Sequence, residues 1–228
     1  GNMFGKLSRN IMVAAREGGS GDPNSNVALA NAVAKAKEYN MPQDNIERAI
    51  KRGTGEMEGA NYERILYEGY GPGGIAIMVE VMTENKNRTA SDIRNIFSRN
   101  NGNLGETGCV GWLFERKGII LIDKNEASDE DEFMLGVIDA GAEDIEEEGA
   151  FYEIKVEPSA LMKVKENLEK NNFKIKSTEI AFVPKSTVEL SKEDATKALK
   201  LINFLDEHDD VQSVYSNLEI SDEILNKT

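Results

Sequence analysis

The hydrophobic pattern of this chain changes its period near residue 60, and that change limits the possible folds more than any other feature. Phe4, Leu7 and Ile11 recur at helical spacing and form one apolar stripe. From about Tyr62 onward, apolar residues either recur at every second position or form continuous runs, as in residues 75–81, and both patterns are typical of strands. We therefore expect a helical unit followed by a part that mixes strands and helices.

Three helices are expected in the first 55 residues. The first ends at the glycines and proline of residues 18–23, because glycine and proline destabilise the interior of a helix. The second spans about Asn26 to Tyr39, and the third opens near Pro42 and ends with Lys51 and Arg52 before Gly53. The apolar residues that the second helix places on one side are Val27, Ala30, Val33 and Ala34.

Residues 62–110 indicate two strands and a helix. The strands, around Ile65 and Tyr67 and over residues 75–81, are joined by the glycine-rich residues 69–74. The helix spans about residues 88–99. The glycine-rich segments 69–74 and 101–105 lead into strands, so we interpret them as turns and not as nucleotide-binding loops.

The pattern after Gly108 predicts a strand, a helix, two strands, a helix and a strand, which is the ferredoxin-like βαββαβ order. The expected elements are a strand over 110–123 interrupted near 117–118, a helix over 130–140, strands over 142–145 and 151–156, a helix over 160–170 and a strand over 175–182. A strand over 187–190, a helix over 192–207 and a strand over 211–218 follow. These last elements cannot close a sheet alone, so we expect them to return to the sheet of residues 62–110.

The predicted fold is therefore α+β with three domains. They are an N-terminal three-helix domain (1–57), a discontinuous middle α/β domain (58–110 and 186–228) and an inserted ferredoxin-like domain (111–185).

Composition excludes several protein classes. With 39% hydrophobic residues the 228-residue chain is rich enough to bury cores. No apolar run approaches the length of a membrane span, and the first residues lack the pattern of a signal peptide. A single cysteine, Cys109, permits no intramolecular disulfide, which fits a reducing compartment. We expect a cytoplasmic protein without membrane association.

Enzyme signatures are weak. The single histidine, His208, lies in an acidic turn at a helix end and is interpreted as a solvated turn residue, and Cys109 at a strand start is expected to be a small buried hydrophobe. These two residues are too few for a zinc site of the Cys/His type. The acidic runs 129–132 and 144–148 are interpreted as solvated surface. We expect no catalysis, no small-molecule substrate, no metal and no cofactor.

Charge is unevenly distributed along the chain, whose net charge is -14. Residues 1–55 are net +3 and residues 85–117 are net +3, whereas residues 118–228 are net -15. Such a separation of charge lets one face of the protein bind phosphate while the other face is repelled from it. The predicted nucleic-acid contacts are Lys6, Arg9, Arg16, Lys35, Lys37, Arg48, Lys51, Arg52, Lys86 and Arg88.

Lys86 and Arg88 lie in a polar strand-to-helix turn, residues 85–89, where helix amides also favour anions. An ordinary capped loop, with Asn87 or Thr89 near the cap, is the alternative interpretation of this turn.

Several motifs in one order resemble the YebC-type family of probable transcriptional regulators. They are Gly18-Gly19 with Asp22-Pro23, Asn40-Met41-Pro42, residues 44–53, the Tyr67–Gly74 segment, Asn87-Arg88-Thr89, Gly102–Gly105 and Arg116-Lys117-Gly118. The resemblance implies the three-domain layout given above. The family usually begins with a further basic segment, and it tends to have arginines where this chain has Ala28 and Ala30.

Three functions follow as hypotheses. The resemblance implies a DNA-binding transcriptional regulator, and the charge distribution agrees with it. Some members of the family resemble ribosome-associated translation factors, so ribosomal RNA is the first alternative target; no helix here shows a row of side chains suited to reading base edges. An acidic protein-interaction scaffold is the second alternative.

Overall fold

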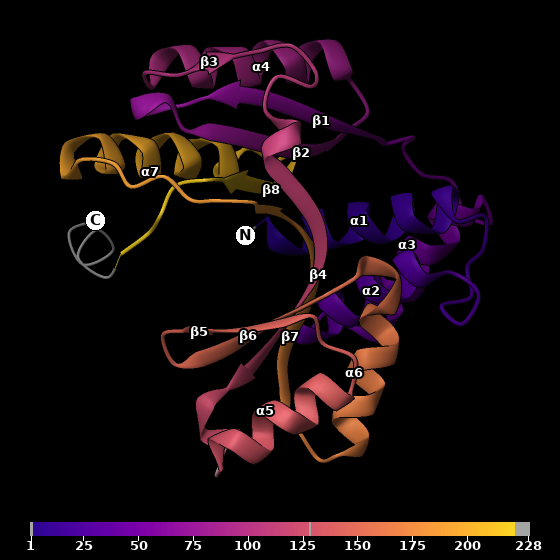
Figure 1. Ribbon diagram of the computed structural model, residues 1–228. Coiled ribbons are helices and arrows are strands. Elements are labelled where there is room, and N and C mark those ends of the chain that lie inside the picture. The colour runs from indigo at the N-terminus through magenta and orange to yellow at the C-terminus, as the bar shows by residue number, and fades with distance from the viewer. Residues whose placement is uncertain (1, 128, 222–228) are drawn as a thin grey trace.

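The computed structural model describes residues 2–127 and 129–221 and confirms a fold of mixed helices and sheets (Figure 1). Three helices come first: α1 (Met3–Glu17), α2 (Val27–Glu38) and α3 (Gln43–Thr54). Two antiparallel four-stranded sheets follow, with strand orders β3-β1-β2-β8 and β5-β6-β4-β7. Figure 1 shows the long strand β4 leading from the side of the first sheet into the second.

The close crossing of α1 and α3 depends on Gly53. A Cβ atom at this position would lie 2.5 Å from the backbone oxygen of Met12 and 2.8 Å from the Cβ of Ala15. Helix α3 continues through Gly53 to Thr54, and the next residue, Gly55, caps it with a left-handed φ of 86°. The predicted end before Gly53 is wrong, because this glycine serves helix contact and not termination.

Helix α2 buries a side that shares only Val33 with the one its apolar pattern indicated. The buried residues are Leu29, Ala32, Val33 and Ala36. Val27 is 53% exposed, and Ala30 and Ala34 are partly exposed. Alanine recurs on several sides of this helix, so the sides differ little in hydrophobicity. The packing against α1 therefore decides which side is buried.

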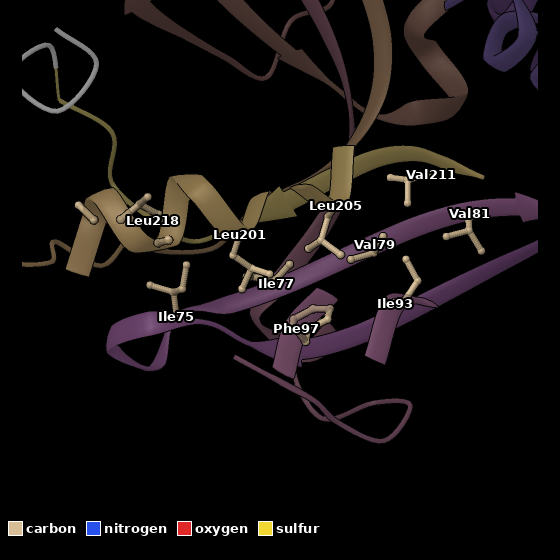
Figure 2. Close-up of a cluster of buried hydrophobic side chains, with 12 residues drawn as sticks. Ile75, Ile77, Val79, Val81, Ile93, Phe97, Leu201, Leu205, Val211 and Leu218 are labelled. Atoms are coloured by element: carbon tan, nitrogen blue, oxygen red, sulfur yellow. The ribbon is translucent and has the colours of Figure 1, made fainter. Parts of the chain in front are cut away.

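The first sheet carries the core drawn in Figure 2. β1 (Glu63–Tyr70) and β2 (Ala76–Thr83) form an antiparallel pair, and α4 (Lys86–Arg99) leads to the short β3 (Asn103–Leu104). After the second sheet the chain returns as α7 (Lys192–Glu207) and β8 (Val211–Ser216), and β8 pairs with β2. Residues from β2, α4 and α7, such as Ile77, Phe97 and Leu201, meet in this core.

The second sheet contains the βαββαβ order. Its elements are β4 (Phe114–Asp123), α5 (Glu130–Asp139), β5 (Asp144–Glu148), β6 (Phe151–Val156), α6 (Leu161–Lys170) and β7 (Ile175–Pro184).

Two strand predictions are wrong. β4 begins at Phe114 because residues 111–113 form a 3-10 turn, and it runs unbroken through Gly118, which is in register with Val156 and Ile180. Residues 187–190 form only a single bridge, from Val188 to Leu218, and not a strand. The division of the chain into three domains stays a prediction.

Candidate nucleic-acid interface

Helix α3 presents three of the predicted cations to solvent. Ile46, Ala49 and Gly53 face the other helices, so Arg48, Lys51 and Arg52 lie on the exposed sides. Arg48 and Arg52, one helical turn apart, line a shallow hollow of about 240 Å³ together with Phe4, Gly5, Ser8, Met41 and Asn45. Within the described residues none of the three cations has an ion-pair partner. Their charges remain available to an anionic ligand.

Lys6 and Arg9 face inward, toward the turn between α7 and β8. The Nζ atom of Lys6 donates to the backbone oxygen of Asp206 at 2.6 Å, and burial lowers the pKa of this amine. Arg9 Nη1 lies 2.7 Å from Asp210 Oδ1 and 3.1 Å from the backbone oxygen of Met82. These donors hold α1 against the first sheet.

Asp210 is the centre of this contact, with its side chain only 4% exposed. Thr89 Oγ1 donates to Oδ2 at 2.7 Å, and Arg88 Nη2 donates to the same oxygen at 3.3 Å. Burial alone would raise the pKa of Asp210, but the hydrogen bonds from Thr89 and Arg9 and the charge of Arg9 hold it below its usual value. Asp210 is therefore a buried carboxylate that two arginines and a threonine stabilise.

Lys86 and Arg88 begin α4. Asn85 Oδ1 accepts the backbone N–H of Arg88 at 3.1 Å, so Asn85 is the cap and not Asn87 or Thr89. Arg88 shares Asp210 with Arg9, yet its side chain is 53% exposed, and Lys86 is exposed. The first turn of α4 thus presents two cations to solvent.

The other three predicted residues point elsewhere. Arg16 Nη1 donates to Asn61 Oδ1 in the segment that leads to β1. Lys35 lines a cleft between α2 and the sheets, whereas Lys37 lines a groove beside α6. The ten cations therefore do not form one surface: the structure brings together the α3 trio and, separately, the group around Asp210.

The cleft beside Lys35 includes cations that sequence reasoning missed. It has a volume of about 500 Å³, and Arg64 and Arg116 also line it. Glu80 and Glu179 lie on the same walls, and Arg64 is paired with Glu80 at 3.2 Å. Arg64 stands among acidic residues in the sequence, so no local signal identifies it; the convergence arises only where α2, β1, β2, β4 and β7 meet.

The residues weighed as catalytic groups have structural contacts. His208 Nε2 lies 2.9 Å from Asp92 Oδ2, and its Nδ1 accepts the backbone N–H of Asp210 at 3.1 Å. The interpretation of His208 as a solvated turn residue is wrong, because α4 approaches it. Burial, followed by the charge of Glu68, raises the pKa of the Cys109 thiol.

Two further properties concern the described residues as a group. No three Cys, His, Asp or Glu side chains among residues 2–127 and 129–221 are placed to hold a metal ion. None of the described helices combines the length and hydropathy of a membrane span.

Two family models match nearly the whole chain. Residues 1–56 match the TACO1/YebC protein N-terminal domain, and residues 62–218 match the TACO1/YebC second and third domain. The chain belongs to the TACO1/YebC family. The two matched ranges meet at the segment that joins α3 to β1.

Relatives in the TACO1/YebC family are similar over most of their length. A probable transcriptional regulatory protein of Pelotomaculum thermopropionicum is 54% identical over 97% of this chain and 91% of its own. One of Persephonella marina is 53% identical over 100% and 91%. The crystal structure of a conserved hypothetical protein of Aquifex aeolicus matches with a TM-score of 0.89 and 47% identity, covering 98% of this chain and 92% of the other.

Proposed function

We propose that this chain is a cytoplasmic transcriptional regulator that binds DNA through the exposed cations of α3, supported by Lys86 and Arg88. The observation that carries the proposal is the α3 trio: Arg48, Lys51 and Arg52 are exposed together and are not neutralised within the described structure. Relatives that cover almost the whole chain are named probable transcriptional regulatory proteins, which supports the regulatory role.

Electrostatics supports an oriented encounter with nucleic acid. Residues 118–228 carry a net charge of -15, so phosphates are repelled from the second sheet and α7 and are attracted to the helical unit. Phosphate contacts of this kind give affinity without sequence information. Base reading on duplex DNA would need additional contacts in a groove.

The experiment is a salt titration of binding to a DNA duplex and to a folded RNA hairpin. We expect the wild-type affinity to fall steeply with salt, because bound cations release counterions from the phosphates. Replacing Arg48, Lys51 and Arg52 together by Gln should weaken binding at low salt and reduce the slope of log K against log salt by about 3, which is about 1 for each lost phosphate contact.

The matched control replaces Lys163, Lys170 and Lys174 by Gln, which removes the same charge from the acidic part of the chain. This control should bind as the wild type does. Equal binding by the α3 variant and the control would refute the α3 interface. Preference for the RNA hairpin over the duplex would refute DNA as the target and favour the ribosomal RNA alternative.

A further inference from the structure

The single tryptophan of the chain, Trp112, is 67% exposed. It lies in the 3-10 turn of residues 111–113, between β3 and β4. Single exposed apolar side chains are common on protein surfaces, but Trp112 is the most exposed of the large hydrophobic residues that the structure describes. The position of this ring on the surface therefore needs an explanation.

The ring is held in place by its polar edge. Trp112 Nε1 donates to the backbone oxygen of Cys109 at 3.1 Å. The hydroxyl of Tyr70, an exposed residue at the end of β1, donates to the same oxygen at 3.3 Å. Two exposed aromatic side chains thus meet at one carbonyl group. Because their polar atoms are satisfied internally, their ring surfaces are what they offer to a ligand.

A buried carboxylate holds the loop beneath these rings. Glu68 is 4% exposed, and its side chain accepts the backbone N–H groups of Gly108 at 2.6 Å, Val110 at 3.2 Å and Gly111. Its backbone oxygen accepts the N–H of Gly105 at 2.9 Å. The loop is ordered before any ligand arrives, which reduces the entropy that binding would cost.

The surroundings favour a planar ligand of limited size. Asn103 pairs with Tyr70 in the sheet, and Asn103, Glu106 and Thr107 are exposed polar residues on the same segment. A stable protein interface buries about 800 Å² on each partner around an apolar centre, whereas two rings in a polar loop provide area for one or two flat groups. Lys185, exposed after β7, lies close by, since its N–H donates to the backbone oxygen of Leu113 at 2.9 Å.

We propose that Trp112 and Tyr70 form a stacking platform for unpaired nucleobases of single-stranded nucleic acid. Every base has a flat aromatic face, and stacking on protein rings requires no particular sequence. Bases within a duplex are already stacked and paired, so the platform takes single strands, melted segments or RNA loops. This inference rests on the nucleic-acid binding in the proposed function, and it assigns to the first sheet a contact that differs from the phosphate contacts of α3.

The tryptophan reports on its own site. With excitation selective for indole, the emission of the full chain comes from Trp112 alone, because the chain has one tryptophan. The probes are oligothymidylate, oligouridylate, an abasic oligomer of equal length and a dA·dT duplex. We expect both base-bearing single strands to quench the emission, and the abasic oligomer and the duplex to leave it unchanged. A larger quench by oligouridylate would assign the platform to RNA, and one by oligothymidylate to single-stranded DNA; each supports the proposal.

Substitution separates stacking from charge. Trp112→Ala should weaken binding of the single strands by about fivefold or more, the loss expected for one base stack, without changing the salt slope. Trp112→Phe should retain part of the affinity. The control, Phe204→Ala, removes another exposed aromatic ring, on α7, and should have no effect.

The outcomes distinguish this inference from the proposed function. Suppose that the wild type binds with a steep salt dependence, that its Trp112 emission is not quenched, and that Trp112→Ala binds as tightly as the wild type. The inference of a stacking platform is then wrong, and the α3 interface stands. If single strands quench Trp112 while the α3 variant binds normally, the platform stands and the α3 interface is wrong. Absence of binding to every nucleic acid at low salt would overturn both.

Discussion

At the scale of single residues, Asn26 joins two helices. It is buried; its Oδ1 accepts the N–H of Leu29 at 3.1 Å, and its Nδ2 donates to the backbone oxygens of Ala14 at 2.9 Å and Ser20 at 3.0 Å. A Cβ at Gly18 would lie 2.2 Å from this Nδ2. The glycine of the Gly18-Gly19 motif therefore makes room for an amide that ends α1 and begins α2.

Asn26→Ala should reduce the free energy of unfolding by about 2–3 kcal/mol, because the helix cap is lost and two carbonyl groups lose their donor. Urea denaturation measures this difference. Asn24→Ala, an exposed position two residues earlier, is the control and should change stability by less than about 0.5 kcal/mol. Equal stability of the two variants would show that the amide contacts contribute nothing.

At the scale of elements, two helical glycines have opposite surroundings. Gly53 of α3 lies against the backbone of α1, where a Cβ atom would be 2.5 Å from the Met12 oxygen. Gly136 of α5 has room, since the nearest atoms to such a Cβ are those of Phe173 at 3.5 Å. Helix propensity favours alanine at both positions, so the packing of α1 on α3 decides the difference.

Gly136→Ala should stabilise the protein by about 0.5–1 kcal/mol, whereas Gly53→Ala should destabilise it by about 1–3 kcal/mol because two helices must separate. Thermal and urea unfolding of the two variants provide the comparison. A stabilising Gly53→Ala substitution would contradict the close crossing of α1 and α3.

At the scale of the whole molecule, the helical unit is held to the first sheet by charge. Arg9 reaches across from α1 to Asp210, immediately before β8, and Gln212 Nε2 donates to the backbone oxygen of Lys6 at 3.1 Å. On the other side, Glu38 Oε1 of α2 accepts the N–H of Thr178 in β7 at 3.0 Å. The helices thus contact both sheets, and the exposed face of α3 is positioned by contacts made elsewhere.

Asp210→Asn should destabilise the chain by about 3–5 kcal/mol at neutral pH, because it leaves the charge of Arg9 partly buried without its partner. Glu207→Gln, in an exposed position on α7, is the control and should be nearly neutral. Urea denaturation at several pH values measures both.

The pH dependence has a defined sign. The pKa of Asp210 is lower in the folded state than in the unfolded state, so its contribution is complete above the unfolded value of about 3.9 and is lost as the pH falls through the folded value. The difference in stability between the wild type and Asp210→Asn should therefore shrink below about pH 4. A constant difference across this range would mean that Asp210 is not charged in the folded protein.

Apart from the strand expected over residues 187–190, the sequence by itself determined the kinds of element and their order. Helical spacing in residues 4–52, alternation from residue 62 onward and the βαββαβ order after Gly108 are local patterns, and each is set by which positions along one element are apolar. The exposure of Arg48, Lys51 and Arg52 also followed locally, since their neighbours on α3 supply its buried stripe.

Only the tertiary structure decided which side of α2 is buried. It also decided that Arg9 pairs with Asp210, that His208 pairs with Asp92, and that Glu68 orders the loop under Trp112. These partners are separated by some 40 to 200 positions in the sequence. Burial and charge pairing depend on where distant segments meet, and local periodicity carries no information about that meeting.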